Sequence, residues 1–477
     1  MTQTAIAWLR TDLRLADNPA LHAAVQAGER AIALYIHETT PGVRPPGAAA
    51  RWWIHHSLVS LGAALAERGI ELLVLEGDAH VVIPQVVASS GASAVFWNRR
   101  YAPGERMADA AIKDALHEKG IKADSFAANV LVEPWEITTK QGKPYSVYTP
   151  FWKTLRDMPM AQPLGPIPKG TPIRADEADS AYREPKWAGK LGQHWQIGED
   201  GAQAALHRFL DERLDDYSVG RDFPRLDATS TLSAHLRHGE ISPRQVWAAA
   251  QAVAHAEPER QAAVDKFLSE LAWRDFNYHQ LYHRPDITTV PMQPKFAGIE
   301  WRAAQDDLRA WQRGQTGLPI VDAGMRQMWE TGYMQNRVRM LTASLLCKNL
   351  LIDWRLGEQW FWDCLVDADI ANNPGNWQWV AGSGMDASPF FRIFNPVTQG
   401  ERFDDAGEYV RRWVPELARM PDEWVHEPSA APAEVLRAAG VVIGETYPAP
   451  IVDLKLSRVR ALKASKRLQE FSLGTPS

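Results

Sequence analysis

The stretch AIAWLRTDLRLADNPALHAAVQAGERAIALYI, residues 5–36, contains a strand, a helix and a second strand in succession. The apolar runs at 5–9 and 31–36 have the length and β-rich composition of buried strands. Asn18 and Pro19 begin the intervening helix and Gly28 ends it, because asparagine caps a first turn, proline is tolerated there and glycine closes a last turn. The stretch therefore predicts two parallel strands joined by a helical crossover.

This alternation continues along the first part of the chain. The same pattern predicts, in order, a helix at 49–68, a strand at 70–75, a helix before residue 94, a strand at 94–97, a helix at 105–119 and a strand at 121–126. Five strands alternating with helices predict a Rossmann-like α/β domain with a five-stranded parallel sheet. Neither a GxGxxG fingerprint nor a P-loop motif follows the first strand, which argues against dinucleotide and P-loop chemistry.

The rest of the chain has a different pattern. Residues 131–200 are rich in Pro, Gly and Lys, which is typical of a connection that runs over a surface. Helical periodicity replaces strand alternation from about residue 201 onward. We therefore expect an α/β domain at 1–130, an interdomain connector at 131–200 and an all-α domain at 201–477.

Composition narrows the class of protein. The chain has 477 residues, of which 45% are hydrophobic and 23% charged, which excludes a disordered chain and a small disulfide scaffold. Its net charge of −6 means that a polyanionic partner must be bound by a local basic patch. Cys347 and Cys364 are too far apart for a CxxC motif, and we find neither a signal sequence nor a membrane span. These features predict a cytoplasmic protein without a membrane partner. The 20 tryptophans suggest a use for indoles beyond packing.

Polar groups gather in three segments of the helical part. The sequence TSTLS, residues 229–233, precedes an apolar helix start and suits either an ordinary helix cap or a phosphate held by hydroxyl and amide groups. Glu270, Trp273 and Arg274 share one helix face, where an ion pair is the simplest interpretation. In NRVRM, residues 336–340, an amide, two guanidinium groups and a thioether lie within a turn and a half.

The segment DADIANNPGNWQW, residues 367–379, combines carboxylate, amide and indole groups. Its aspartates are spaced by two, as in a calcium loop, but the glycine and the glutamate that such a loop needs are missing. We therefore predict no metal site and expect a nucleotide or another heterocycle here.

These motifs stand in the order in which the DNA photolyase and cryptochrome family has them. WLRTDLRLADNPAL, PYSVYTPFWK, RDFP, TSTLS, ELAWRDF, TGLPIVDAGMRQM, NRVRMLTAS, DWRLGE, NNPGNWQW and FFRIFNPVTQG together span nearly the whole chain. The first half resembles the family's antenna domain and the helical half resembles its flavin domain. The resemblance is greatest to members of class I type that repair cyclobutane pyrimidine dimers.

The resemblance implies that FAD lies folded in the helical domain. Tyr217 and residues 229–233 would contact its phosphates, and Asp367, paired with Arg339, and Asp369 would lie near its ribose and ring edge. Asn373 would face flavin N5, where an amide supplies no proton and favours the anionic reduced flavin. The implied flavin-binding residues are Tyr217, Thr229, Ser230, Thr231, Leu232, Ser233, Arg339, Asp367, Ala368, Asp369 and Asn373.

Three indoles match the family's electron chain. Trp377 would lie beside the flavin, Trp354 in the middle, and Trp301 at the surface, where an external reductant refills it. The catalytic residues that the resemblance implies are Glu270, Asn373, Trp301, Trp354 and Trp377.

The resemblance also implies a pocket for damaged DNA. Photolyases act on a nucleotide that is flipped out of the duplex, as is established for the enzyme class. Trp273 and Trp379 would form the apolar walls, and Glu270 and Asn336 would hydrogen-bond the edges of the dimer. The implied DNA and lesion contacts are Arg221, Glu270, Trp273, Arg274, Asn277, Asn336, Arg337, Met340, Trp379, Arg392 and Gln399.

Two positions favour cyclobutane dimers over 6-4 photoproducts. Relatives that repair the latter carry histidines where this chain has Asn336 and Met340, and an amide or a thioether cannot transfer the proton that this chemistry needs. We therefore expect light-driven dimer repair in UV-damaged DNA by a monomer. The main alternative is a cryptochrome-type photoreceptor that binds flavin without repairing DNA, and a plain nucleotide-binding protein is a third.

The chain departs from the family pattern at several positions. Asn277 replaces a usual tyrosine, and Pro374 lies beside Asn373. Gly104 replaces the asparagine that precedes Glu105 in folate-binding relatives, so a second antenna chromophore of folate or deazaflavin type is possible but unidentified. For four further aromatic residues of the antenna domain we expect a core or surface role: Trp52, Trp53, His55 and His56.

Overall fold

The computed structural model describes residues 3–175, 178–387, 389–390 and 392–474. The chain forms two compact units. The first unit comprises Met1–Asp215, Ser230–Pro285 and Val366–Ala371, and the second comprises Asp216–Thr229, Asp286–Leu365 and Asn372–Ser477.

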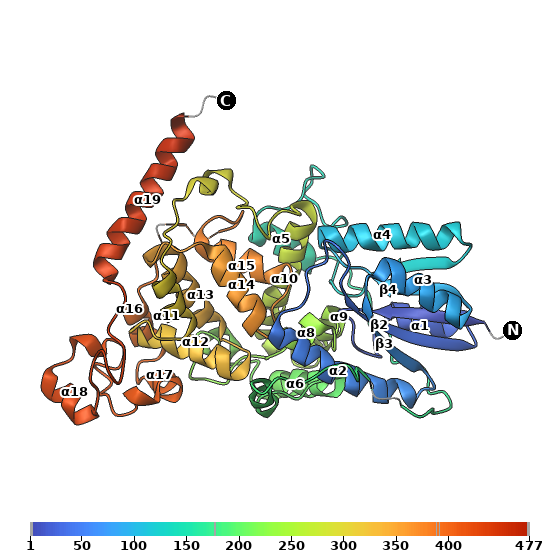
Figure 1. Cartoon of the computed structure of the whole chain (residues 1–477), viewed down its shortest axis with the longest axis horizontal. Helices are drawn as coiled ribbons and strands as arrows, with labels where there is room; N and C mark the ends of the chain where they lie inside the picture. Colours follow the sequence, from blue (N-terminus) through green and yellow to red (C-terminus); the bar gives the residue numbers. More distant parts are fainter. Residues whose placement is uncertain (1–2, 176–177, 388, 391, 475–477) are drawn as a thin grey trace. The chain divides into compact units, whose positions relative to one another are not determined.

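The first unit contains a parallel sheet with the order β3-β2-β1-β4-β5 (Figure 1). Its strands are β1 (Thr4–Leu9), β2 (Arg30–Glu38), β3 (Glu71–Gly77), β4 (Ala92–Asn98) and β5 (Lys122–Phe126). The order reverses direction between β1 and β4, where the carboxyl ends of parallel strands leave a crevice for ligands in this class of fold. The predicted five-stranded parallel sheet is confirmed.

Helices cover both faces of this sheet. Side chains alternate along β1, so that Ile6 and Trp8 pack with Trp97 on one face while Ala7 and Leu9 pack with Leu58 on the other. The Asn18 side chain accepts a hydrogen bond from the Leu21 amide at 3.2 Å, which confirms the predicted cap. The helices of the first unit are α1 (Pro19–Ala27), α2 (Ala48–Ala66), α3 (Ala79–Ser90), α4 (Pro103–Glu118), α5 (Tyr148–Arg156), α6 (Glu199–Glu212), α8 (Ser233–His238), α9 (Pro243–Ala256) and α10 (Gln261–His283), with 3-10 turns η1 (Ala188–Gln193) and η2 (Pro258–Arg260).

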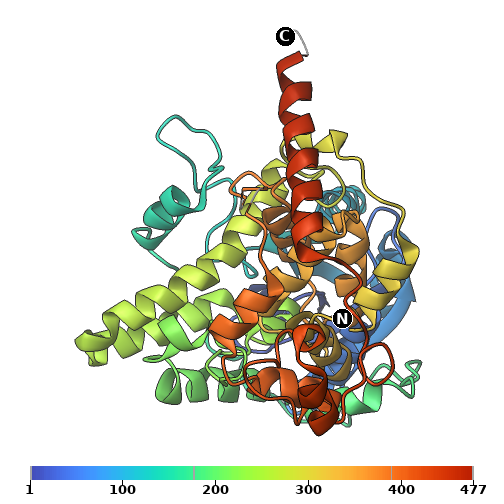
Figure 2. The same cartoon turned by 90° about the vertical axis from the view of Figure 1, so that its left-hand side faces the viewer.

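The second unit is helical in the part of the chain that the structure describes. Helices α12 and α13 can pack closely because Gly324 has no side chain. A Cβ at this position would lie 2.2 Å from Val338 Cγ1. The last helix, α19, runs straight toward the carboxyl terminus (Figure 2). The helices are α7 (Tyr217–Gly220), α11 (Gln305–Gln312), α12 (Pro319–Thr331), α13 (Asn336–Ser344), α14 (Trp354–Cys364), α15 (Asn372–Ala381), α16 (Pro396–Phe403), α17 (Glu408–Trp413), α18 (Ala433–Ala439) and α19 (Leu454–Gly474), with the π-helix η4 (Leu345–Asn349) and 3-10 turns η3 (Pro294–Gly298), η5 (Pro415–Leu417) and η6 (Pro428–Ala430).

The two compact units divide the chain differently from the domains expected at 1–130, 131–200 and 201–477, which stay a prediction. Three parts of the helical sequence, 201–215, 230–285 and 366–371, belong to the α/β unit. One physical reason is the Arg14 guanidinium, which is fully buried and donates to the carbonyl oxygens of Gly239 and Ala128 at 2.9 and 3.1 Å. The described residues include no helix that is long and apolar enough to cross a membrane.

Candidate active site

The first unit brings the TSTLS segment next to the acidic segment 366–371. Ser233 Oγ donates to Asp367 Oδ2 at 2.7 Å, and Arg237 Nε donates to the Ala368 carbonyl at 2.6 Å. Thr231 has a φ of 54°, a left-handed conformation that few residues other than glycine adopt. This strained turn lies just before α8, and its hydroxyl and amide groups are suited to an anion.

Asp369 is held from two sides in the first unit. Its Oδ2 accepts from the Tyr278 hydroxyl at 2.5 Å and its Oδ1 accepts from the Ala371 amide at 3.0 Å. Burial and the neighbouring carboxylate raise the pKa of Tyr278, so that the phenol stays a donor. Asp369 is therefore a fixed, buried acceptor of the kind that binds a ribose or a ring N–H.

The expected lesion residues of the first unit lie on α10. Trp273 stacks face to face on Tyr148, with ring centroids 3.7 Å apart and planes 13° apart. The Tyr148 hydroxyl donates to the Ser269 carbonyl, which fixes the supporting ring. Glu270 Oε1 lies 2.6 Å from Lys266 Nζ, one helical turn away. Glu270 and Trp273 are both half-buried.

Arg274 and Asn277 point into the first unit. The Arg274 guanidinium donates to the Asn129 carbonyl at 2.7 Å and lies 3.4 Å from Asp275 Oδ2. Burial raises the pKa of Asp275 to about 6. Asn277 is buried, so the position where relatives have tyrosine is part of the packed interior here.

In the second unit, Asn373 lies at the start of α15 and is fixed by Glu358. Its Nδ2 donates to the Glu358 carbonyl at 3.0 Å and to Glu358 Oε1 at 2.8 Å. These two acceptors identify the nitrogen end of the amide, because amide orientation is assigned from the hydrogen bonds that it makes. The carbonyl oxygen of Asn373 is therefore the end that can accept a hydrogen bond from a ligand. The neighbouring Pro374 lies within α15 and is buried.

The three indoles of the expected electron chain all lie in the second unit. Trp377 and Trp354 are buried, with exposed fractions of 3% and 1%, and Trp301 is partly exposed. The Trp377 ring lies edge-on to Phe361 at 5.0 Å and to Trp311 at 6.1 Å between centroids. Trp301 is therefore the only one of the three indoles with appreciable exposure, as the terminal member of such a chain should be, and the electron route itself stays a prediction.

The expected DNA-contacting residues of the second unit differ in their exposure to solvent and in their contacts with other side chains. Arg337 lies 2.8 Å from Asp222 Oδ1 and over the Phe403 ring, whereas Asn336 and Arg392 are exposed. The Arg221 carbonyl accepts from Gln335 Nε2. Three further members are half-buried, namely Met340, Trp379 and Gln399. Of the expected flavin-binding residues in this unit, Arg339 is half-buried and Tyr217 is buried. The pairing of Arg339 with Asp367 joins residues of different units and stays a prediction.

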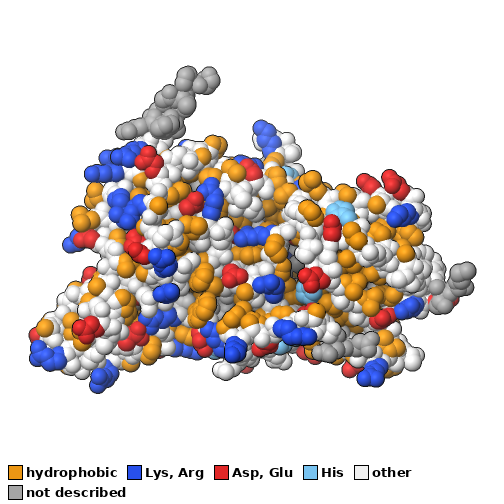
Figure 3. All heavy atoms as spheres, viewed as in Figure 1, with side chains coloured by type: hydrophobic (Ala, Val, Ile, Leu, Met, Phe, Trp, Pro, Cys, Tyr) orange, Lys and Arg blue, Asp and Glu red, His pale blue; other side chains and the backbone are white. Residues whose placement is uncertain are grey.

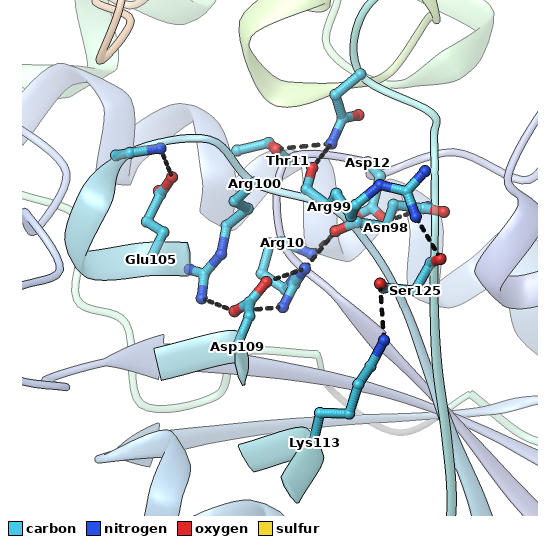
Figure 4. A network of polar contacts seen from close by, with 12 residues as sticks. Arg10, Thr11, Asp12, Asn98, Arg99, Arg100, Glu105, Asp109, Lys113 and Ser125 are labelled. Atoms are coloured by element: carbon cyan, nitrogen blue, oxygen red, sulfur yellow. Dashed lines mark hydrogen bonds and ion pairs between the residues drawn. The ribbon is translucent and has the colours of Figure 1, made fainter. Parts of the chain in front are cut away.

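The crevice at the carboxyl ends of β1 and β4 is filled by the chain's own polar side chains (Figure 4). Asp109 on α4 lies 3.3 Å from Arg10 and 2.8 Å from Arg100, and Arg100 also pairs with Glu38. The Arg10 guanidinium lies 4.1 Å above the Trp8 ring. A ligand at this crevice would have to displace these ion pairs, and a buried charge left without its partner costs on the order of several kcal/mol.

The position where folate-binding relatives have asparagine is a closely packed glycine, Gly104, in this chain. A Cβ on Gly104 would lie 1.9 Å from the Gly42 carbonyl oxygen, so an asparagine cannot replace this glycine without moving backbone. The Glu105 carboxylate accepts from the Ala102 amide at 3.1 Å and caps its own helix. Burial raises the pKa of Glu105. A second chromophore of folate or deazaflavin type stays a prediction.

The four aromatic residues singled out on the long antenna helix are structural. The Trp53 indole donates to Glu240 Oε1 at 3.0 Å and stacks on His238, and Trp52 is fully buried. His55 Nδ1 lies 3.0 Å from Asp179, and His56 lies 3.1 Å from Glu184. Their expected core or surface role agrees with these contacts.

Three supporting side chains had no role in the sequence interpretation. Tyr148 and Glu358 lie in the motifs PYSVYTPFWK and DWRLGE, where only membership of the motif marked them. Gln378 is fully buried and binds the backbone of Ile287, Val290 and Met292. No periodicity in the sequence indicates these partners.

The described geometry defines a class of protein: an α/β unit with a filled strand-end crevice and a helical unit whose fixed amide and buried indoles suit a flavin. The model for DNA photolyase matches residues 5–169, and the model for the FAD binding domain of DNA photolyase matches residues 267–467. A deoxyribodipyrimidine photo-lyase of Agrobacterium fabrum is 47% identical over 97% of this chain and 98% of its own. Cryptochrome-1 of Arabidopsis thaliana is 36% identical over 98% of this chain and 71% of its own.

Among solved structures, a bacterial class III photolyase from Agrobacterium tumefaciens superposes with a TM-score of 0.93 at 45% identity, covering 98% of both chains. The chain belongs to the DNA photolyase family, and it contains that family's FAD-binding domain. The predicted family, two-part architecture and flavin cofactor are thereby confirmed. Because this neighbour is called class III, the class I subtype stays a prediction.

The donor set of the described residues fits FAD. The first unit offers hydroxyls and amides at 230–233 and the fixed carboxylate of Asp369. The second unit offers the oriented amide of Asn373. Phosphates, ribose hydroxyls and a ring N–H are the groups that such donors and acceptors bind.

Proposed function

We propose that this protein repairs cyclobutane pyrimidine dimers in DNA in a light-dependent reaction. The observation that carries the proposal is Asn373, whose amide hydrogens are both donated to Glu358. This geometry supports a neutral hydrogen-bond acceptor at the flavin, where an ionisable acid would supply a proton. When bound, reduced FAD supplies the excited electron that splits the two bonds of the cyclobutane ring and that returns afterwards.

FAD would be held by the residues that the resemblance implies. The hydroxyl and amide groups of Ser230–Ser233 would bind phosphate, and Asp369 would accept from the ribose or ring edge. Asn373 would hold an N–H at its carbonyl oxygen without titrating. Trp301, Trp354 and Trp377 would carry electrons inward from an external reductant, in keeping with the partial exposure of Trp301 and the burial of the other two.

The lesion pocket would use a rigid indole wall. Trp273 is fixed by Tyr148, so it can stack on an extruded base without first losing rotamer freedom. Trp379 would form the opposite wall, and Glu270 and Asn336 would bind the polar edges of the dimer. Glu270 must exchange its contact with Lys266 for the dimer, or share it.

Cations would contact the phosphates that flank the lesion. On the face shown in Figure 3, basic and acidic side chains are interspersed, in keeping with the net charge of −6. Arg221, Arg337 and Arg392 would therefore act locally, and Arg337 would give up its ion pair with Asp222. DNA affinity should fall steeply with salt, because each phosphate contact releases a counterion.

The test is blue-light repair of an oligonucleotide that carries one thymine dimer, by purified and chemically reduced protein, with a dark control. Repair in light alone supports the proposal, and Glu270→Ala and Trp273→Ala should then lower repair. If the flavin is bound and reduced yet the dimer survives, the photoreceptor alternative replaces this proposal. We also propose a monomer in a reducing, cytoplasmic compartment, and gel filtration tests the first part of this statement.

A further inference from the structure

The last helix of the second unit, α19, concentrates positive charge. Between residues 454 and 468 the sequence contains six basic residues and no acidic one, namely Lys455, Arg458, Arg460, Lys463, Lys466 and Arg467. Several Lys and Arg side chains are visible over α19 on the face shown in Figure 3. The whole chain has a net charge of −6, so this positive charge is a local feature of the kind that a polyanionic partner requires.

The inner face of α19 is fixed to the second unit. Ala461 and Leu468 are buried in an apolar cluster that also contains Phe390. Ser457 is buried, and its hydroxyl oxygen accepts a hydrogen bond from Asn349 Nδ2 at 2.9 Å. These inner positions recur at helical spacing, so the opposite side of the helix is left to face solvent.

The basic face of α19 consists of four exposed side chains, Lys455, Arg458, Lys463 and Lys466. None of the four forms an ion pair with another residue that the structure describes, whereas Arg467 lies 3.4 Å from Glu300 Oε2. Like charges one turn apart on a helix, such as Lys463 and Lys466, disfavour the helix by themselves. A bound anion would relieve this repulsion.

The spacing of the basic face suits the backbone of duplex DNA. The step from Lys455 to Lys466 corresponds to about 16 Å of helix axis. A DNA strand presents one phosphate for about every 3.4 Å of duplex axis, so this face spans about five phosphates. Lysine ammonium groups on flexible stems bind phosphates as point charges and read no base sequence.

The basic face lies close to an expected phosphate contact, Arg392. Phe390 and Ile393, which flank Arg392 in the sequence, pack in the apolar cluster that holds the inner face of α19. Arg392 itself is exposed, and its carbonyl oxygen accepts from Lys348 Nζ at 2.9 Å. The second unit therefore holds Arg392 and α19 together, so that phosphates beyond those at Arg392 can reach the helix.

A membrane surface is a less suitable partner than DNA. A helix that lies in a membrane interface buries a continuous apolar face among the lipids. The apolar face of α19 is already buried in the second unit. On the outer side, Leu456 and Val459 are 70% and 51% exposed, and such scattered apolar side chains are normal on a protein surface.

We propose that the basic face of α19 binds the phosphate backbone of the duplex that flanks a bound lesion, as a second DNA-binding surface beside Arg392. This inference rests on the proposed function, because it extends the contact with damaged DNA beyond the lesion pocket. The contact depends on neither the base sequence nor the lesion. It should raise the affinity for long duplexes and leave the light-driven step unchanged.

The test is binding of FAD-loaded protein, in the dark, to dimer-containing duplexes of two lengths, measured by fluorescence anisotropy. A duplex of about 10 base pairs centred on the dimer leaves little backbone for a face that spans about five phosphates, whereas one of about 30 base pairs reaches it. The variant carries Lys463→Gln together with Lys466→Gln. Between about 50 and 200 mM salt, each phosphate contact accounts for roughly a threefold loss of affinity. On the long duplex the wild-type protein should therefore lose about tenfold more affinity than the variant, and on the short duplex the two should behave alike.

A matched control separates the position of the charges from their number. Lys119→Gln together with Lys122→Gln removes two exposed lysines of the first unit, and it should leave the salt dependence unchanged. Glutamine keeps the helix propensity of lysine, so the α19 variant should fold normally. The flavin absorption spectrum of each variant confirms that FAD is bound. Sedimentation with vesicles that contain phosphatidylserine tests the membrane alternative, and we expect no difference between the α19 variant and the wild-type protein.

Equal salt dependence of the wild-type protein and the α19 variant on the long duplex would overturn the inference, and so would an equal effect of the control pair. Loss of vesicle binding in the α19 variant with unchanged DNA binding would overturn it in favour of a membrane surface. Light-driven repair at saturating DNA is the separate arm. Repair by the wild-type protein with wild-type DNA affinity in the α19 variant removes only this inference. Lower DNA affinity in the α19 variant without any repair by the wild-type protein leaves the DNA-binding helix and removes the proposed function.

Discussion

Replacing Gly357 by alanine should displace the Trp377 indole. Gly357 lies on α14, and an added Cβ would lie 2.2 Å from Trp377 Cη2, 2.6 Å from Cζ3 and 2.6 Å from Leu346 Cδ2. Since ordinary contacts begin at 3.4 Å, the ring must move by about 1.2 Å or the helix must shift by as much. Trp377 is 3% exposed and packed by Phe361 and Trp311, so it has little room to move.

The energetic consequence follows from two opposing effects. Alanine is favoured over glycine in a helix by about 1 kcal/mol. Overpacking a close-packed interior costs about 1–3 kcal/mol, and the short contacts at Gly357 place it at the upper end. We therefore expect Gly357→Ala to lower the free energy of unfolding by about 2 kcal/mol and to slow flavin photoreduction.

The assay combines urea unfolding with the rate of flavin photoreduction under blue light and an external reductant. Gly298→Ala is the control, because a Cβ there meets its nearest neighbour, Leu468 Cδ2, at 3.7 Å. A smaller ring should relieve the clash, so Gly357→Ala should cost less stability in a Trp377→Phe background than alone. Wild-type stability and photoreduction in Gly357→Ala would refute this reasoning, and so would additive behaviour of the two substitutions.

Three further predictions concern other buried groups. Tyr148→Leu should weaken binding of dimer-containing DNA several-fold by freeing Trp273, while Tyr148→Phe should retain most of the affinity. Wild-type affinity for dimer-containing DNA in Tyr148→Leu would contradict this role. Burial lowers the pKa of Lys348 from 10.5 to about 8. Between pH 8 and 10.5 the lysine is therefore protonated in the unfolded chain but neutral in the folded protein. The free energy of unfolding should rise with pH across this range by on the order of 3 kcal/mol. Lys348→Met should flatten this rise in urea titrations, and an unchanged slope would exclude Lys348 as its source. Burial lowers the pKa of His279 from 6.5 to about 4. The free energy of unfolding should therefore fall as the pH drops from 6.5 to 4, again by on the order of 3 kcal/mol. His279→Gln should remove this pH dependence in thermal melts, and a wild-type pH profile in the variant would contradict the assignment to His279.

The sheet could be predicted from the sequence because its signal is local. Apolar runs at 5–9, 31–36 and 94–97 correspond to β1, β2 and β4 within one or two residues at each end. The cap at Asn18 was also predictable, since its partner Leu21 is three residues away. The identity of the family followed from the order of the motifs, which needs no knowledge of three-dimensional contacts.

The supporting contacts of the candidate site could not be predicted in this way. Tyr148 supports Trp273 from a different helix, and Glu358 orients Asn373 from 15 residues away. Ser233 and Asp367 are 134 residues apart in the sequence and 2.7 Å apart in the first unit. Helical periodicity gives the buried face of each helix but not which helix covers it.

The sequence by itself therefore determined the parallel sheet, the helical half and the chemical character of the flavin and lesion residues. Only the tertiary structure decided that Arg10, Arg100 and Asp109 fill the strand-end crevice, because an ion pair between separate elements depends on their packing. It also decided that Trp329 and Trp360, on α12 and α14, lie parallel at one cavity. Periodicity is set by each residue's near neighbours, whereas a cavity is set by where separate helices fail to fill space.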